Sequence, residues 1–165
     1  MLFRSGSALI GKEKVVINDI LTEIAEELEI MPEEERLTLH TDFNEQVIID
    51  GNLSLIGSIF RNLTENAIAY SEGKNIFISL IKNNDTECHI RFEDDGKGVE
   101  PEQLPRLFER FYRVDKARSR EAGRTGLGLS ICSQIVEYYN AQMDIQSEVD
   151  KGTSITILFP KKFTV

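Results

Sequence analysis

The chain has 165 residues, of which 41% are apolar and 28% are charged, and this composition predicts one ordinary globular domain rather than a disordered or fibrous chain. Its 19 basic and 28 acidic residues give a formal net charge of −9, which argues against a general surface for nucleic acid or anionic membranes. The two cysteines indicate neither a disulfide scaffold nor a zinc site. No apolar run approaches the roughly 20 residues that span a bilayer, so we expect a soluble chain of the reducing cytoplasm.

The beginning of the chain predicts a short leading segment followed by a helix. Residues 1–14 show no periodicity and are interpreted as a tag or linker remnant, which leaves 15–165 as the domain. From Ile17–Leu28, apolar residues recur at the three- and four-residue spacing of an amphipathic helix. Asn18 or Asp19 is expected to cap this helix.

The rest of the chain mixes strands and helices without strict βαβ alternation. Strands are predicted at Arg36–Thr41, Gln46–Asp50, Asn75–Lys82, Thr86–Asp94, Gln142–Glu148 and Thr153–Pro160. Helices are predicted at Asn52–Tyr70 and Gly126–Tyr139. This order favours an α+β sandwich with one mixed sheet and helices packed on one face. Residues 95–125 have no such pattern, and a connection of this length is typical of a lid or binding loop.

Two asparagines interrupt the apolar stripe of the longer predicted helix. Asn62 and Asn66 are four residues apart and continue the row that Leu55 and Ile59 begin. Buried amides without partners would each cost about 1 to 3 kcal/mol. They are either hydrogen-bonded within the domain or available to a cation and a polar ligand, and the pair by itself leaves both interpretations open.

Asp94 ends the apolar face of a predicted strand. Alternation places Cys88, Ile90, Phe92 and Asp94 on one side of that strand. A carboxylate in such a position needs a donor, because burying an unpaired charge is costly. The glycines that follow, in Asp-Asp-Gly-Lys-Gly, free the backbone to turn tightly past a ligand, although an ordinary turn at the end of a strand has the same sequence.

A glycine-rich segment and a basic cluster indicate an anion site. Residues 101–125 hold seven basic and four acidic side chains, a local excess of +3 in an acidic chain. Gly123–Leu129 then enters the last predicted helix, where free N–H groups and the positive end of the helix dipole favour anions. A small, strongly anionic ligand is therefore expected here.

The order of these motifs resembles that of the ATP-binding catalytic domain of sensor histidine kinases. The sequence has Asn-x-x-x-Asn, then Asp-x-Gly-x-Gly, then Leu-Phe-Glu-Arg-Phe-Tyr-Arg, then Thr-Gly-Leu-Gly-Leu, and the resemblance extends over Val15–Pro160. It implies the Bergerat fold, a two-layer α/β sandwich shared with gyrase, mismatch-repair ATPases and heat-shock chaperones. It also implies a long ATP lid at about residues 96–125.

The resemblance implies a role for each matching residue. Asn66 is expected to coordinate Mg²⁺ through its amide oxygen, Tyr70 to pack on adenine, and Asp94 to accept a hydrogen bond from the adenine amino group. Arg113 is the lid residue expected to reach phosphate. The residues expected to bind the nucleotide are Asn62, Asn66, Tyr70, Asp94, Gly96, Gly98, Arg113, Thr125, Gly126, Leu127, Gly128 and Leu129. Gly96 and Gly98 are expected to keep the pocket floor clear, and the aromatic residues expected to anchor the lid are Phe108, Phe111 and Tyr112.

The sequence departs from the family pattern in several places. Ala69 stands where a phosphate-binding lysine is common, Arg124 where a glycine is common, and Asp150 replaces the first glycine of the final turn. The phosphorylated histidine of the family lies on a separate helical domain. His40 and His89, the two histidines of this sequence, do not match its motif and are interpreted as surface residues.

The resemblance implies a domain that binds Mg·ATP and transfers the γ-phosphoryl group to a histidine on a separate dimerisation domain, in two-component signal transduction with a downstream response regulator. The parent protein could be membrane-anchored, and this fragment is expected to be a monomer. Two alternatives are an ATPase of the gyrase or chaperone kind and a non-catalytic nucleotide sensor. Because the position of the ATPase base is occupied by Asn62, little intrinsic ATP hydrolysis is expected.

Overall fold

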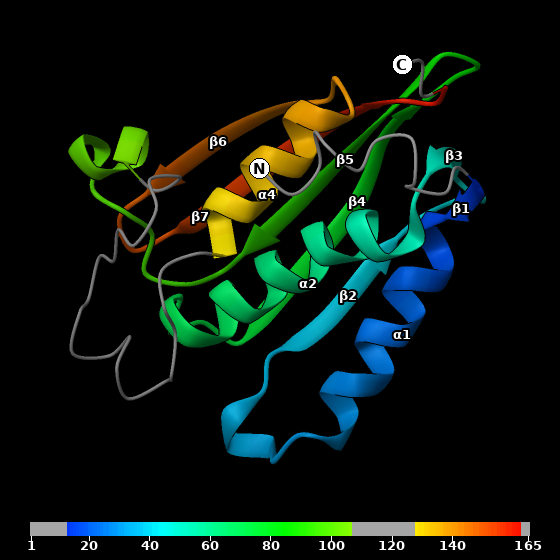
Figure 1. Cartoon of the computed structure of the whole chain (residues 1–165). Helices are drawn as coiled ribbons and strands as arrows, with labels where there is room; N and C mark the ends of the chain where they lie inside the picture. The colour runs from blue at the N-terminus through cyan, green and yellow to red at the C-terminus, as the bar shows by residue number, and fades with distance from the viewer. Residues whose placement is uncertain (1–12, 107–127, 163–165) are drawn as a thin grey trace.

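The computed structural model describes residues 13–106 and 128–162. Its main sheet has five strands in the order β2-β4-β5-β7-β6, and the three α-helices of the described residues lie across one face of that sheet (Figure 1). The strands are β2 (Thr38–Asp42), β4 (Asn75–Asn83), β5 (Glu87–Asp94), β6 (Gln142–Glu148) and β7 (Gly152–Pro160). Since β2 pairs with β4 in parallel while the other neighbours are antiparallel, the sheet is mixed. The predicted α+β sandwich is confirmed.

The helices of the covering layer lie close to the predicted positions. They are α1 (Ile17–Ile30), α2 (Leu53–Tyr70) and α4 (Gly128–Tyr138), with short 3₁₀ turns η1 (Glu33–Glu35) and η2 (Pro101–Arg106). Their apolar faces meet the sheet in one core, whose largest fully buried side chains include Phe60 and Phe159. The ring centroids of Phe60 on α2 and Phe159 on β7 lie 6.2 Å apart, so helix and sheet share this core.

A second, two-stranded sheet lies beside the first helix. Strand β1 (Glu13–Val16) pairs antiparallel with β3 (Ile48–Gly51). The sequence predicted β3 but not β1, which starts two residues before the expected domain start at residue 15. The expected cap of α1 was wrong, because the helix begins at Ile17 with Val16 as its N-cap and without a side-chain cap.

Asn18 has a different role from the one predicted. Its side-chain oxygen accepts a hydrogen bond from the backbone N–H of Val47 at 2.8 Å, and its amide donates to the carbonyl of Glu45 at 3.2 Å. The side chain thereby connects α1 to the segment that leads into β3.

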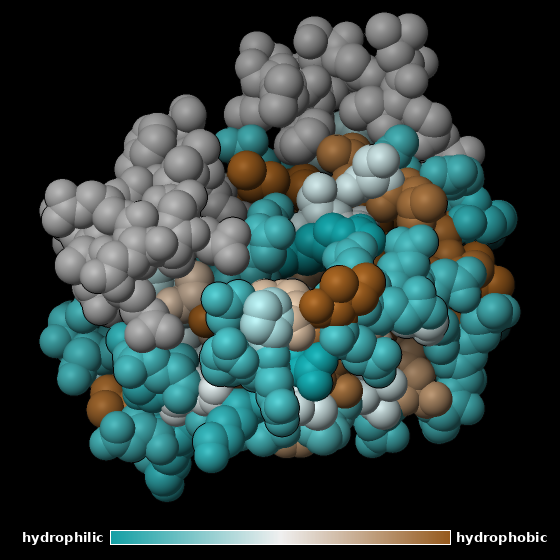
Figure 2. Space-filling view, turned by 90° about the horizontal axis from the view of Figure 1, so that it is seen from below, coloured by the Kyte–Doolittle hydropathy of each residue, from teal (hydrophilic) through white to brown (hydrophobic). Residues whose placement is uncertain are grey.

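The surface seen from below the view of Figure 1 is largely polar. Figure 2 shows a face that is mostly hydrophilic, with hydrophobic residues in limited areas, as is usual for a globular domain. Ile30, at the end of α1, is 85% exposed. Within the described residues, no helix is both long and apolar enough to cross a membrane.

Candidate functional site

The two asparagines of α2 lie at the edge of its buried face. Ile59 and Leu63 are buried, whereas Asn62 and Asn66 are each partly buried. Among the residues that the structure describes, neither asparagine side chain is hydrogen-bonded to another residue. The amides are therefore placed beside the core rather than inside it, where their oxygens are available to a ligand.

The start of α2 is fixed from two directions. The Asn52 side chain accepts a hydrogen bond from the N–H of Leu55 at 3.0 Å, which caps the helix. The backbone N–H of Asn52 donates to the hydroxyl of Tyr139 at 2.8 Å. Burial raises the pKa of this tyrosine, so the hydroxyl stays protonated at neutral pH and the contact joins α2 to the chain just after α4.

The other end of α2 contacts the turn that follows β5. The N–H of Lys97 donates to the carbonyl of Ser71, directly after the helix, at 2.7 Å. A Cβ at position 96 would overlap the same carbonyl, so only glycine fits there. The close approach places Tyr70, the last residue of α2, beside the chain that carries Asp94.

Asp94 is where alternation predicted it, at the end of β5 after buried Cys88, Ile90 and Phe92. Its Oδ1 accepts a hydrogen bond from the N–H of Gly96 at 2.9 Å. Burial raises the pKa of the Asp94 carboxyl, and hydrogen bonds from backbone N–H groups offset part of that increase. The carboxylate is partly desolvated, which strengthens its attraction for a donor such as an amino group.

The final turn of the domain supports the same segment from the opposite side. Gly98 has a φ of +70°, and a Cβ there would overlap the carbonyl of Glu148. The N–H of Asp150 donates to the carbonyl of Lys97 at 2.8 Å, and the N–H of Val99 donates to Ser147 Oγ at 2.8 Å. The sequence predicted that the two glycines keep a pocket floor clear. The structure shows that each makes room for the domain's own backbone.

Gly128 and Leu129, two residues of the predicted phosphate turn, begin α4. Leu129 is 8% exposed, and the thiol of Cys132 donates to the carbonyl of Ile59 on α2 at 3.5 Å. The start of α4 therefore packs beside the helix that carries the asparagines. Four further residues expected to bind the nucleotide lie outside the described residues: Arg113, Thr125, Gly126 and Leu127. Arg124 and the aromatic residues of the expected lid anchor lie outside them as well.

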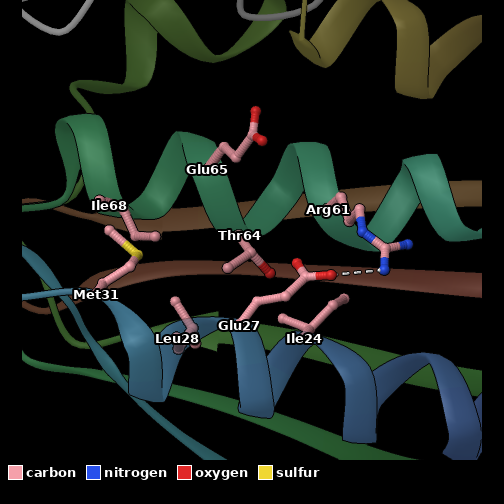
Figure 3. Close-up of a pocket in the computed structure, with 8 residues that line it drawn as sticks. All are labelled: Ile24, Glu27, Leu28, Met31, Arg61, Thr64, Glu65 and Ile68. Carbon is pink, nitrogen blue, oxygen red and sulfur yellow. Dashed lines mark hydrogen bonds and ion pairs between the residues drawn. The ribbon is translucent and has the colours of Figure 1, made fainter.

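A shallow pocket of about 110 Å³ lies between α1 and α2 (Figure 3). It is lined by Ile24, Glu27, Leu28, Met31, Arg61, Thr64, Glu65 and Ile68. The guanidinium of Arg61 contacts the carboxylate of Glu27 across it at 3.0 Å. Helical spacing places Asn62, Asn66 and Tyr70 on another side of α2, so this pocket is separate from the predicted nucleotide site.

The histidines differ in burial. His40 is exposed on β2, and its ring stacks on Phe77 with the ring centroids 4.9 Å apart. His89 is partly buried on β5, so it is less exposed than predicted. Its Nε2 lies 3.2 Å from Oε1 of Glu87. Neither lies on a helix.

Residues 51–162 match the family of histidine kinase-, DNA gyrase B- and HSP90-like ATPases. The chain belongs to this family. The match includes α2, the turn after β5 and α4, which are the elements that carry the described site residues. Membership identifies the chain as an ATP-binding domain of the kind found in sensor histidine kinases.

Named relatives agree with this assignment. The chain is 36% identical over 110 residues to sensor protein SrrB of Staphylococcus aureus, covering 67% of this chain but 19% of that protein. The fold is similar to that of a mycobacterial sensor histidine kinase, MprB, with a TM-score of 0.76, 20% identity, and coverage of 93% of this chain and 100% of that one. The nucleotide-free catalytic domain of histidine kinase ThkA has the same TM-score and identity, with coverage of 93% and 97%.

Proposed function

We propose that this domain binds Mg·ATP and, within a full-length sensor kinase, transfers the γ-phosphoryl group to a histidine on a separate dimerisation domain. The observation that carries the proposal is the contact between the end of α2 and the turn after β5. It brings the helix of Asn62, Asn66 and Tyr70 together with Asp94. This contact supports a site in which amide, aromatic and carboxylate groups from the two elements act on one ligand.

Within this proposal, each described residue has a separate task. The Asp94 carboxylate accepts a hydrogen bond from the adenine amino group, and the Tyr70 ring packs on the base. Gly128 and Leu129 offer N–H groups to phosphate at the start of α4. Arg113, Thr125, Gly126 and Leu127 complete the phosphate contacts.

The Mg²⁺ ion is assigned to the side-chain oxygen of Asn66. A hard ion prefers oxygen ligands and is usually held by one or two protein groups together with phosphates and water. The amide of Asn66 fits this requirement, because it is partly buried and is not hydrogen-bonded to any other residue that the structure describes. When bound, the ion would neutralise phosphate charge, while the protein contributes positioning.

The nucleophile and the signalling partners belong to the proposed parent protein. The chain spans about a fifth of the length of the curated relatives that it matches. We therefore assign the acceptor histidine to a dimerisation domain of that parent and the next phosphoryl transfer to a response regulator. The domain itself is proposed to be cytoplasmic and monomeric, without a nucleic-acid partner.

One alternative is autonomous ATP hydrolysis, since the family includes gyrase-like and HSP90-like ATPases. Such an enzyme needs a general base one helical turn before the metal asparagine, and Asn62 occupies that position. An amide does not accept the proton of water at neutral pH. Rapid ATP turnover by the isolated chain would contradict this argument and favour the ATPase.

The first experiment is calorimetric titration of a non-hydrolysable ATP analogue, with Mg²⁺ and then with EDTA. Metal-dependent binding at micromolar to submillimolar dissociation constants is expected. No binding in either condition would contradict the nucleotide-binding role.

Kinase activity requires a separate assay. Adding the parent's histidine domain with ATP and Mg²⁺ should produce acid-labile phosphate on that domain. Nucleotide binding without phosphate transfer would favour a non-catalytic sensor.

A further inference from the structure

Asp95, the residue after Asp94, accepts three hydrogen bonds although its side chain is exposed. Its Oδ1 accepts from the backbone N–H groups of Lys74 and Asn75, at 2.8 and 2.9 Å. Its Oδ2 accepts from the side-chain amide of Asn75 at 2.8 Å. The backbone N–H of Asp95 also donates to the carbonyl of Asn75 at 3.3 Å. One carboxylate thus connects the turn after β5 to the start of β4.

These bonds join two segments that are 20 residues apart in the sequence. Residues 71–75 run from the end of α2 into β4, and residues 95–97 follow the end of β5. Gly73 allows the approach, because a Cβ there would overlap Asp95 Oδ1. A 2.7 Å ion pair between Lys97 and Glu72 adds a further connection. The backbone of Asp94 is also paired with Ile76 and Thr153 in the sheet, and this junction adds a direct connection to the segment after α2.

The hydrogen-bonded chain continues to β2. Since the amide nitrogen of Asn75 donates to Asp95, its Oδ1 faces His40, whose Nε2 lies 2.8 Å away and donates to it. The His40 ring is stacked on Phe77, at an interplanar angle of 16°. Asn75 is thus held in one orientation by partners on both sides, which orients its donor toward Asp95.

We propose that Asp95 is a positioning residue for nucleotide recognition, which holds the turn so that the Asp94 carboxylate meets the adenine amino group. This role rests on the proposed function of the site. Asp95 itself does not contact the base; it acts through Asp94. The same turn is held by Lys97 and Gly96 against Ser71, and Asp95 adds the contacts that fix its rotation relative to β4.

The electrostatics agree with this role. Although burial raises the pKa of Asp95, the hydrogen bonds from Asn75 and Lys74 lower it by more, so the net shift is downward. The carboxylate is therefore ionised at neutral pH and accepts all three hydrogen bonds in its charged form, which strengthens them.

The test compares two nucleotides that differ at the amino group that Asp94 is proposed to recognise. A non-hydrolysable ATP analogue and its inosine equivalent, which lacks that amino group, are titrated with Mg²⁺ into the 165-residue chain and its variants. The unchanged chain should prefer the adenine analogue by about tenfold or more. Asp95→Ala should weaken adenine binding by about tenfold while leaving inosine binding within about twofold, so that the preference is lost.

Two further variants separate positioning from general damage. Asp95→Asn keeps one oxygen for the backbone N–H groups of Lys74 and Asn75, so it should restore most of the preference. Asp95→Ala made on an Asp94→Asn background should change adenine binding by less than about twofold, because the residue acts through Asp94. Asp85→Ala, in the hairpin at the other end of β5, is the matched control and should leave both affinities unchanged.

The possible failures are distinguishable. Equal weakening of both nucleotides by Asp95→Ala, or no change in either, would overturn the positioning role while leaving the nucleotide site intact. If the unchanged chain binds neither nucleotide, the proposed function and this role are both overturned. Thermal unfolding of each variant identifies any that is unfolded, and the Asp95→Asn result then decides the question.

Discussion

Replacing Asp94 with asparagine should weaken nucleotide binding without weakening the fold. The asparagine oxygen can still accept from the N–H of Gly96, which now lies 2.9 Å from Oδ1. The second carboxylate oxygen becomes an NH₂ group, which opposes the adenine amino group instead of accepting from it. The lost hydrogen bond involves a charged acceptor, so we expect a cost of about 1.5 to 3 kcal/mol in binding. This corresponds to a dissociation constant about 10- to 150-fold larger.

The same substitution should not lower the free energy of unfolding at neutral pH, although it weakens nucleotide binding. Because burial raises the pKa of Asp94 in the folded state, the folded chain holds this proton more tightly than the unfolded chain. The contribution of Asp94 to the free energy of unfolding therefore falls as the pH rises from the unfolded pKa through the raised folded pKa. At neutral pH the ionised form is disfavoured, and the neutral asparagine removes that penalty. The variant should be at least as stable as the unchanged chain at pH 7 and lose this advantage in acid.

Calorimetric titration measures the first effect, and urea denaturation at neutral and acidic pH measures the second. Unchanged affinity for the ATP analogue would mean that Asp94 is outside the nucleotide site. A variant that is less stable than the unchanged chain at pH 7 would refute the desolvation argument, even if nucleotide binding were lost.

Three further predictions concern the metal ligand and the backbone of the site. Asn66→Ala should remove the Mg²⁺ dependence of binding, so calorimetry should give equal affinities with Mg²⁺ and EDTA; loss of affinity in both conditions would contradict the ligand role. Gly98→Ala should lower the free energy of unfolding by at least about 2 kcal/mol in urea denaturation, because residue 98 has positive φ and no room for a Cβ. The control is Gly57→Ala in α2, where the added Cβ meets only the end of the Arg61 side chain. This variant should raise the free energy of unfolding by about 0.5 to 1 kcal/mol. Asp150→Gly should raise the free energy of unfolding by about 1 kcal/mol, since Asp150 has a φ of +69°. A lower free energy of unfolding would show that the Asp150 side chain stabilises the turn.

Most elements could be predicted because their apolar spacing records which face is buried. The helix α2 was expected at Asn52–Tyr70 and is found at Leu53–Tyr70, with Asn52 as its cap. The hairpin of β4 and β5 also lies where alternation placed it. These patterns are local, and one buried face over many residues is a strong signal.

Features that depend on distant partners could not be predicted. Strand β1 has four residues, and only its pairing with β3 identifies it as a strand. The three- and four-residue spacing of the last predicted helix favours Leu127, Ile131, Ile135 and Tyr139 as its inner face; Ile135 and Tyr139 are buried, Ile131 is partly buried, and Leu127 lies outside the described residues. Cys132 and Val136, which that spacing does not single out, are buried as well. A short helix has several apolar sides, and the packing against α2 selects among them.

The site shows the same division between local and distant information. Asn66 and Asp94 could be singled out because a polar residue within an apolar pattern is visible in the sequence. Asp95 and Asn75 could not, since each is an ordinary exposed polar residue in its local context. Their importance comes from hydrogen bonds between segments 20 residues apart.

The turn after β5 is held on both sides by residues that do not belong to the recognised motif. Ser71 and Asn75 connect it to the end of α2 and the start of β4, and Ser147 and Asp150 connect it to the last hairpin. A carboxylate that recognises one amino group must be fixed in direction, because a hydrogen bond weakens steeply when its angle is wrong. The backbone of Asp94 is paired with Ile76 and Thr153 in the sheet, but β5 ends at this residue and the turn after it needs further contacts. The direction comes from the neighbouring segments, so specificity for adenine should be sensitive to substitutions well outside the motif.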